Sequence, residues 1–292
     1  MSNIIGIDIG GTNFRIGLAD SDGVMQKFRK LPVRNVLKSE NVLEDIAAFI
    51  EDFAEGGKIA AAAAGFPATL NRERTKILQA PNIKFMEDLP VVEYLSERLN
   101  TKIFAERDVT MTLCYDLKKY RVPEKGVIIG VYFGTGVGNA IMIDGKFLRG
   151  RNGTAGELGH IPVEGSEELC GCGLKGCIEN LAGGKYLAGR YSAEEMPEVF
   201  VKHIPELEEY ISRMAVCVSV EVNILDPEYV ILGGGVLNMK GFPKELLHTK
   251  ILEHVRRPYP AENLRVIFAE DEPEKSVQGG IYYALGMKKT AM

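Results

Sequence analysis

The sequence predicts an α/β protein made of two similar halves, and three observations lead to this prediction. Short apolar runs alternate with helical patterns along most of the chain. The pattern of residues 4–30, in which a strand, a Gly-Thr turn, a strand and an Asp-Gly turn follow one another, recurs at residues 127–148. Hydrophobic residues make up 46% and charged residues 26% of the 292 residues, which is the balance of a globular protein with ample core material.

The first half opens with three predicted strands at residues 4–9, 15–20 and 24–33. We expect them to form an antiparallel meander whose first hairpin lies at "GGTN", residues 10–13. A helix is predicted over residues 40–55, because apolar residues recur there at helical spacing. The next predicted elements are a strand at 58–68, a helix at 89–100, a strand at 102–108 and a helix at 109–120.

The second half repeats the strand pattern and then adds longer helices. Strands and tight turns are expected within residues 127–148. The later predicted elements are a helical region at 205–225, a strand at 229–236, a helix at 242–257, a strand at 264–270 and a helix at 276–289. We expect one domain over residues 1–120 and a second over 121–275, with the last helix, about 276–292, packing back on the first.

Net charge, the length of the apolar runs and the N-terminal residues argue against several classes of protein. The net charge is −5, and nucleic-acid-binding proteins usually present a basic face, so we expect no nucleic-acid partner. No apolar run approaches the ~20 residues that span a membrane. The N-terminal residues lack a positively charged segment, so no signal peptide is predicted and a cytoplasmic protein is expected.

Three glycine-rich turns are candidates for binding phosphate. They comprise Gly10, Gly11 and Thr12; Gly134, Thr135 and Gly136; and Gly233, Gly234 and Gly235. Glycine lets backbone N–H groups approach an anion closely, and the third turn would also present a helix N-terminus. The alternative is three tight turns without a ligand. Asp8, just before the first turn, is a candidate for holding Mg²⁺ against phosphates or, alternatively, for capping the turn.

Three cysteines lie within eight residues of a chain that has five cysteines in all. Together with a preceding histidine they give the spacing H-x9-C-x-C-x4-C, formed by His160, Cys170, Cys172 and Cys177. One imidazole and three thiolates make a closed tetrahedral set, which is typical of a structural Zn²⁺ site rather than a catalytic one. A disulfide is weakly supported in a reducing compartment, and a Cys-x-Cys redox pair leaves two ligands unexplained. We assign no role to Cys114 and Cys217, which lie in apolar helical contexts.

Carboxylates flank the cysteine segment and follow a predicted strand. Glu157 lies three residues before His160, and Glu179 follows the cysteine segment. If both glutamates and His160 face one hollow, these three polar groups would suit a polyhydroxylated ligand such as a sugar. Either glutamate alone is equally consistent with a solvated surface. Asp108 ends a predicted strand, where α/β proteins place ligands, and is a candidate general base. An N-cap of the following helix is an equally good interpretation.

The assembled motifs resemble those of the ROK family of sugar kinases, within the actin-like ATPase superfamily. The resemblance covers nearly the whole chain and rests on motifs in family order: "GIDIGGTN", "GFPA", "APN", "ERD", "FGTGVG", "GELGH", "CGCGLKGCIE" and "ILGGGV". It implies an actin-like, ribonuclease H-like fold in which two α/β domains close over a cleft that holds ATP, Mg²⁺ and a sugar. It also implies a homodimer.

The resemblance implies a role for each motif residue. Asp108 would deprotonate the sugar 6-hydroxyl, while Glu157, His160 and Glu179 would hold the anomeric end of the ring. Asn82 and Gly65 would line the other edge of the ring. Asp8 and the first two glycine turns would serve ATP, and Gly233–Gly235 its adenosine.

Two departures from the family pattern bear on the choice of sugar. Arg107 stands where the family usually has an asparagine that bonds a ring hydroxyl, and Ala68 replaces the second glycine of Gly-x-Pro-Gly. The combination of motifs is most similar to the branch that phosphorylates D-allose, the 3-epimer of glucose. Glucokinase and N-acetylmannosamine kinase are the alternatives. Regulators of the family carry a DNA-binding domain before the first motif, and with the first strand expected at residue 4 we expect a kinase.

Overall fold

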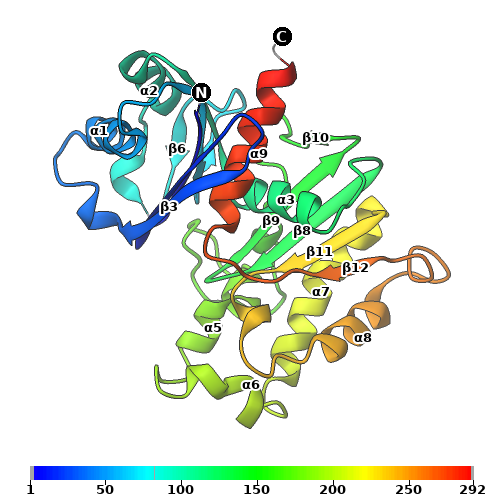
Figure 1. Cartoon of the computed structure of the whole chain (residues 1–292). Helices are drawn as coiled ribbons and strands as arrows, with labels where there is room; N and C mark the ends of the chain where they lie inside the picture. Colours follow the sequence, from blue (N-terminus) through cyan, green and yellow to red (C-terminus); the bar gives the residue numbers. More distant parts are fainter. Residues whose placement is uncertain (1–2, 82, 291–292) are drawn as a thin grey trace. The chain divides into compact units, whose positions relative to one another are not determined.

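The computed structural model of the chain describes residues 3–81 and 83–290. The chain divides into two compact units, each with its own sheet and core (Figure 1). Unit 1 comprises Met1–Arg121, Arg149–Ala155 and Glu272–Met292, and unit 2 comprises Val122–Leu148 and Gly156–Asp271.

The sheet of unit 1 has five strands in the order β3-β2-β1-β4-β7. The strands are β1 (Asn3–Ile9), β2 (Asn13–Ala19), β3 (Met25–Pro32), β4 (Ile59–Phe66) and β7 (Lys102–Arg107). The first three pair antiparallel, as the predicted meander requires, and β4 and β7 continue the sheet in parallel with β1. Parallel strands need crossovers, and the predicted helices supply them.

Helices cover both faces of this sheet. The first face carries α1 (Val42–Ala54) and α2 (Val91–Leu99), whose apolar residues share one buried cluster with the strands. Asn41 caps α1 by accepting a hydrogen bond from the Glu44 N–H. The other face carries α3 (Asp108–Lys119) and α9 (Lys275–Thr290). Gly6 permits the close approach of α9, because a Cβ there would lie 2.1 Å from the Val277 carbonyl oxygen. Short elements complete the unit: η1 (Val33–Asn35), β5 (Thr69–Leu70), β6 (Ile77–Gln79) and η2 (Lys84–Met86).

The sheet of unit 2 repeats the strand order of unit 1. Its order is β10-β9-β8-β11-β12, with β8 (Val127–Phe133), β9 (Val137–Ile143), β10 (Lys146–Phe147), β11 (Tyr229–Gly233) and β12 (Val266–Phe268). The first three strands again form an antiparallel meander, and β11 and β12 again continue in parallel. The two similar α/β halves predicted from the repeated pattern are therefore confirmed.

The larger helices of unit 2 are α7 (Glu208–Leu225) and α8 (Lys244–His254). Shorter helices lie in the segment that the sequence left unassigned or beside the turns: η3 (Leu158–His160), α4 (Glu179–Ala182), α5 (Gly184–Ala188), η4 (Met196–Glu198), α6 (Val199–Lys202) and η5 (Val236–Asn238). None of the helices described in residues 3–81 and 83–290 is long and apolar enough to cross a membrane.

One prediction about the third glycine turn was wrong. The helix predicted at residues 242–257 was expected to present its N-terminus at this turn, but the three-residue helix η5 follows the turn instead. Gly241, with φ +77°, and Pro243 interrupt a helical path, so α8 begins only at Lys244. A long helix N-terminus therefore adds no dipole at this turn.

Candidate active site

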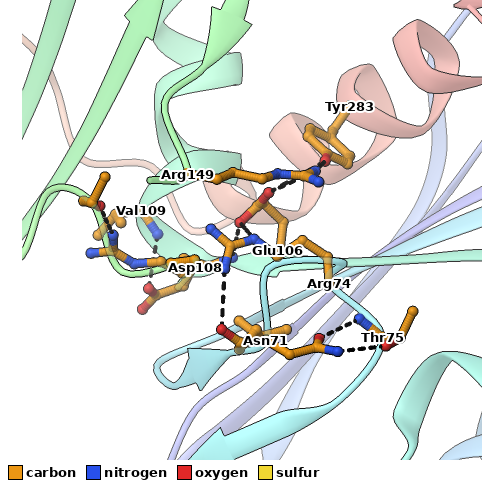
Figure 2. A network of polar contacts seen from close by, with 12 residues as sticks. Asn71, Arg74, Thr75, Glu106, Asp108, Val109, Arg149 and Tyr283 are labelled. Carbon is orange, nitrogen blue, oxygen red and sulfur yellow. Dashed lines mark hydrogen bonds and ion pairs between the residues drawn. The ribbon is translucent and has the colours of Figure 1, made fainter. Parts of the chain in front are cut away.

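Asp108 is the first residue of α3, directly after β7 ends at Arg107. Its Oδ1 accepts a hydrogen bond of 2.8 Å from the Val109 N–H, which fixes the carboxylate at the start of the helix (Figure 2). Gly65 packs closely against this position, because a Cβ there would lie 3.3 Å from the Asp108 Cα. Burial, reinforced by the negative charge of Asp8, raises the pKa of Asp108 to about 6.

Asp8 lies near the end of β1 in a row of residues that runs across the sheet. Strand pairing places Arg15, Asp8, Gly65 and Glu106 side by side on four neighbouring strands. The Asp8 Oδ2 accepts hydrogen bonds from Arg15 (2.6 Å) and from the Ser276 hydroxyl (2.8 Å). The turn that follows, Gly10–Thr12, is closed by a 2.9 Å bond from the Gly10 N–H to the Asn13 carbonyl, with Gly11 and Thr12 exposed.

A buried group of charges lies next to Asp108 in unit 1. Glu106 is fully buried and contacts the guanidinium groups of Arg74 and Arg149, with 2.7 Å between Arg74 Nε and Glu106 Oε1 (Figure 2). The Arg107 side chain donates a 2.8 Å hydrogen bond to the Ala155 carbonyl. The Arg107 side chain is therefore largely buried, and a backbone carbonyl holds its guanidinium.

In unit 2 the glycine turn at residues 134–136 joins β8 to β9. The N–H groups of Gly184 and Lys185 donate to the carbonyls of Gly134 and Thr135, at 2.7 and 2.9 Å. These bonds fix the turn against the start of α5. The space at Gly134 stays open, because a Cβ there would meet nothing within 4 Å. A turn that is both rigid and open at one side suits an anion that approaches the backbone closely.

The glycine turn at residues 233–235 lies beside the turn at residues 134–136, because β11 pairs in parallel with β8 and Gly233 is opposite Tyr132. Gly234 adopts φ +97°, and a Cβ there would lie 2.4 Å from the Phe133 carbonyl oxygen. Only glycine fits this position. Open space surrounds Gly235. The two turns at the carboxyl ends of β8 and β11 thus form one candidate nucleotide-binding edge within unit 2.

The predicted metal ligands converge. One ligand atom each from His160, Cys170, Cys172 and Cys177 lies within 4.8 Å of all the others. The sulfur atoms of Cys172 and Cys177 are 3.6 Å apart, and Cys170 Sγ is 3.6 Å from His160 Nδ1. No disulfide joins the five cysteines, all of which lie in the described part of the chain. Four soft ligands in this compact arrangement fit a closed tetrahedral zinc site.

The two glutamates lie on either side of the histidine. His160 Nε2 is 3.6 Å from Glu157 Oε2, and His160 Nδ1 is 3.7 Å from Glu179 Oε1. Glu179 also accepts a 3.0 Å hydrogen bond from the Cys170 thiol. A Cβ on Gly136 would lie 2.2 Å from Glu179 Oε2, so this carboxylate packs against the first glycine turn of unit 2. The metal group, both glutamates and that turn form one continuous cluster.

The structure brings the predicted residues together within each unit. Unit 1 gathers Asp8, Gly65, Arg107 and Asp108, and unit 2 gathers the metal ligands, the two glutamates and two glycine turns. Asn82 lies outside the described residues. Sequence reasoning missed Arg74, Glu106 and Arg149, because no local pattern indicates an ion pair between residues more than thirty positions apart. Cys217 is buried as expected, whereas Cys114 is only partly buried.

The chain is similar to proteins of one known family along nearly its whole length. The sequence model described as the ROK family matches residues 4–286. A glucokinase from Thermotoga maritima is 27% identical over 283 residues, which cover 86% of this chain and 88% of the relative. An N-acetyl-D-glucosamine kinase from Salmonella paratyphi B is 27% identical over 266 residues, covering 82% and 86%. A ROK hexokinase from Thermus thermophilus has a crystal structure that superposes with a TM-score of 0.79 at 27% identity, covering 99% of each chain.

Proposed function

We propose that this protein, which belongs to the ROK family and is an ATP-dependent sugar kinase, phosphorylates the 6-hydroxyl of a hexose and that the hexose is D-allose. The observation that carries the reaction is Asp108, a carboxylate fixed at a helix start with a pKa raised to about 6. A base with a pKa near the working pH is deprotonated in most molecules and still accepts a proton readily.

In the proposed reaction Asp108 orients the sugar hydroxyl and takes its proton as the oxygen attacks the terminal phosphate of ATP. The bond to that phosphorus forms as the bond between the terminal phosphate and ADP breaks. Phosphoryl transfer needs little covalent chemistry from the protein, so orientation and charge stabilisation supply most of the acceleration. The open, rigid turn at Gly134–Gly136 supports a phosphate-binding role, and the turn at Gly233–Gly235 supports a role with the adenosine.

Asp8 is the proposed partner of the magnesium ion. Both of its hydrogen bonds within the described residues reach Oδ2, so Oδ1 remains available for the ion or one of its water molecules. Magnesium usually keeps several waters and takes one or two carboxylates. The bound ion would neutralise charge on the phosphates, while Arg15 and Ser276 hold the carboxylate in place.

Zinc is the proposed resident of the His160 and cysteine group, because the compact Cys₃His set fits it. Its role is to fold the glycine-rich loop. With His160 Nδ1 toward the metal, Nε2 is left on the side of Glu157. We assign Glu157, His160 and Glu179 to the sugar hydroxyls, and Gly65 and Asn82 to the ring edge expected from the family.

The choice of D-allose rests on Arg107. Asparagine both donates and accepts hydrogen bonds, whereas a guanidinium only donates, so the exchange changes which ring hydroxyl is recognised. The Arg107 guanidinium donates a 2.8 Å hydrogen bond to the Ala155 carbonyl, which fixes its direction. D-Allose differs from glucose in the orientation of the 3-hydroxyl, and we expect Arg107 to alter recognition of the 3- or the 4-hydroxyl of the ring.

A coupled ADP-release assay across a hexose panel tests the proposal, with D-allose, glucose, mannose, N-acetylglucosamine and N-acetylmannosamine as acceptors. We expect the highest kcat/KM with D-allose. Arg107→Asn should move the ratio of kcat/KM for allose over glucose toward glucose by about 10-fold, the value of one good hydrogen bond to a charged group. A wild-type preference for glucose or for either N-acetyl sugar would overturn the allose assignment.

A further inference from the structure

Arg74 and Glu106 form an ion pair that is almost completely removed from water. Their side chains are 6% and 1% exposed, and Glu106 Oε2 also lies 3.3 Å from both Arg149 Nη2 and the Tyr283 hydroxyl (Figure 2). Burying such charges is expensive, and a well-packed apolar pair often serves stability as well or better. The network therefore calls for an explanation other than stability.

The backbone of Arg74 is also strained. Its φ is +60°, a region that arginine rarely adopts. A tight turn imposes this conformation: the Arg74 N–H donates to the Asn71 carbonyl (3.0 Å), and the Asn71 side chain accepts from the Thr75 N–H (2.8 Å; Figure 2). Strained backbone persists where the surroundings require a particular side-chain position. Strain and buried charge thus coincide at one residue.

The strained arginine holds the segment that in turn holds Arg107. The Arg74 Nη1 donates a 2.8 Å hydrogen bond to the Gly153 carbonyl, and Arg107 Nη1 donates one of 2.8 Å to the Ala155 carbonyl. Gly153 packs tightly here, because a Cβ would lie 2.9 Å from the Leu70 carbonyl oxygen. Glu106 links Arg74 to the backbone of Arg107 as well, since its Oε1 also accepts a hydrogen bond from the Arg107 N–H at 3.0 Å.

We propose that Arg74, Glu106 and Arg149 are positioning residues for Arg107. Glu106 holds Arg74, Arg149 and the backbone N–H of Arg107. Arg74 in turn fixes Gly153. The Ala155 carbonyl, two residues further along the same segment, then sets the direction of the Arg107 guanidinium. The network thus determines sugar choice through Arg107 without touching the sugar. This inference rests on the proposed function, in which Arg107 contacts the sugar.

A double-mutant cycle tests the inference, with Arg74→Met, Arg107→Asn and the double variant. The hexose is whichever one the wild-type enzyme prefers, and glucose or allose serves as its competitor. We expect Arg74→Met to lower the kcat/KM ratio between the two hexoses by about 5-fold, mainly through the KM for the preferred sugar, with the KM for ATP unchanged. In the Arg107→Asn background the same substitution should leave the ratio unaltered.

Two further variants keep the test decisive. Arg149→Met removes a partner of Glu106 whose side chain is 31% exposed, so this variant reports on the network if Arg74→Met does not fold. Leu247→Ala is the stability control, because Leu247 is buried in α8 within the separate core of unit 2. It should lower the melting temperature and leave the hexose ratio unchanged.

The outcomes separate the two proposals. A lower melting temperature with an unchanged ratio in both network variants would mean that the network is only structural, and this overturns the inference. Equal effects of Arg74→Met with Arg107 present or replaced would also overturn it, because the network would then not act through Arg107. A preferred sugar other than allose overturns the allose assignment alone, since the cycle is run with that sugar.

Discussion

At Asp108 the protonation state of a single side chain is expected to set the pH dependence of the reaction. Burial raises the pKa of Asp108 to about 6, and only the carboxylate form accepts the sugar proton. The kcat/KM for the sugar should therefore level off above pH 7 and fall toward ~10-fold per pH unit below pH 6. Initial rates between pH 5 and 8 provide the measurement. A profile that stays flat down to pH 5 would remove Asp108 as the base.

Replacement of the same residue separates catalysis from binding. Asp108→Asn keeps the size of the side chain and removes its basicity, so turnover should fall by about 10²-fold or more while sugar binding survives. Calorimetric titration with sugar and the ADP-release assay give the two readouts. Asp52→Asn, at an exposed position of α1, is the matched control and should behave as wild type. Near-normal turnover of Asp108→Asn would contradict the assignment.

At the scale of an element, the cysteine loop is expected to depend on its metal. Cys172→Ser removes one of four ligands, so the purified variant should hold well under one equivalent of zinc and give less folded protein. Metal analysis by mass spectrometry, with wild type expected at one zinc per chain, is the measurement. Cys114→Ser lies outside the ligand group and should keep full zinc content. Equal zinc in Cys172→Ser and wild type would refute the ligand set.

Most elements could be predicted from the sequence because their signals are local. The strand β1 and the helices α1 and α2 follow directly from apolar periodicity, and their predicted bounds differ by only a few residues from those observed. The short helices α4, α5 and α6 escaped prediction, since four or five residues carry no readable period. The helix predicted at residues 242–257 is present as α8, but it begins nine residues after Gly235 and so does not serve the glycine turn at Gly233–Gly235.

The candidate site was only partly predictable for a related reason. Motif residues such as His160 and Asp108 were visible because their neighbours in sequence share their task. Arg74 and Glu106 form a pair through the pairing of β4 with β7 and a strained turn, neither of which has a one-dimensional signature. Long-range polar partners of this kind become visible only with the fold.

For the whole molecule, a buried acid in unit 2 should make stability fall as the pH rises from the acidic range to about 8. Burial raises the pKa of Glu221 to about 8, and its Oε2 accepts a 2.7 Å hydrogen bond from the buried Asn139 amide. The folded state thus binds a proton that the unfolded state releases above pH ~4.3. The free energy of unfolding should therefore fall by about 1 kcal/mol per pH unit from there up to pH 8, where the loss levels off.

Glu221→Gln should remove this part of the pH dependence. The glutamine keeps an acceptor for Asn139 and cannot ionise, so the variant should melt several degrees above wild type at pH 8 and close to it at pH 5. Thermal melts at both pH values supply the comparison. Parallel losses of melting temperature in the two proteins would mean that Glu221 is not the group responsible.

The homodimer expected from the family resemblance stays a prediction at this scale. Light scattering coupled to gel filtration should report twice the 32.1 kDa of one chain. A monomer mass at micromolar concentration would contradict it.

The seven residues Arg149–Ala155 belong to unit 1 although the chain on both sides of them belongs to unit 2. In a chimera between two kinases of this kind, neither unit can be cloned as one uninterrupted gene fragment, because each unit is made of separate segments of the chain. A swap that keeps residues 122–271 whole would separate Arg149 and Gly153 from their partners Glu106 and Arg74. Recombination breakpoints should therefore fall on each side of residues Arg149–Ala155, so that this segment is exchanged together with unit 1, which contains Asp108.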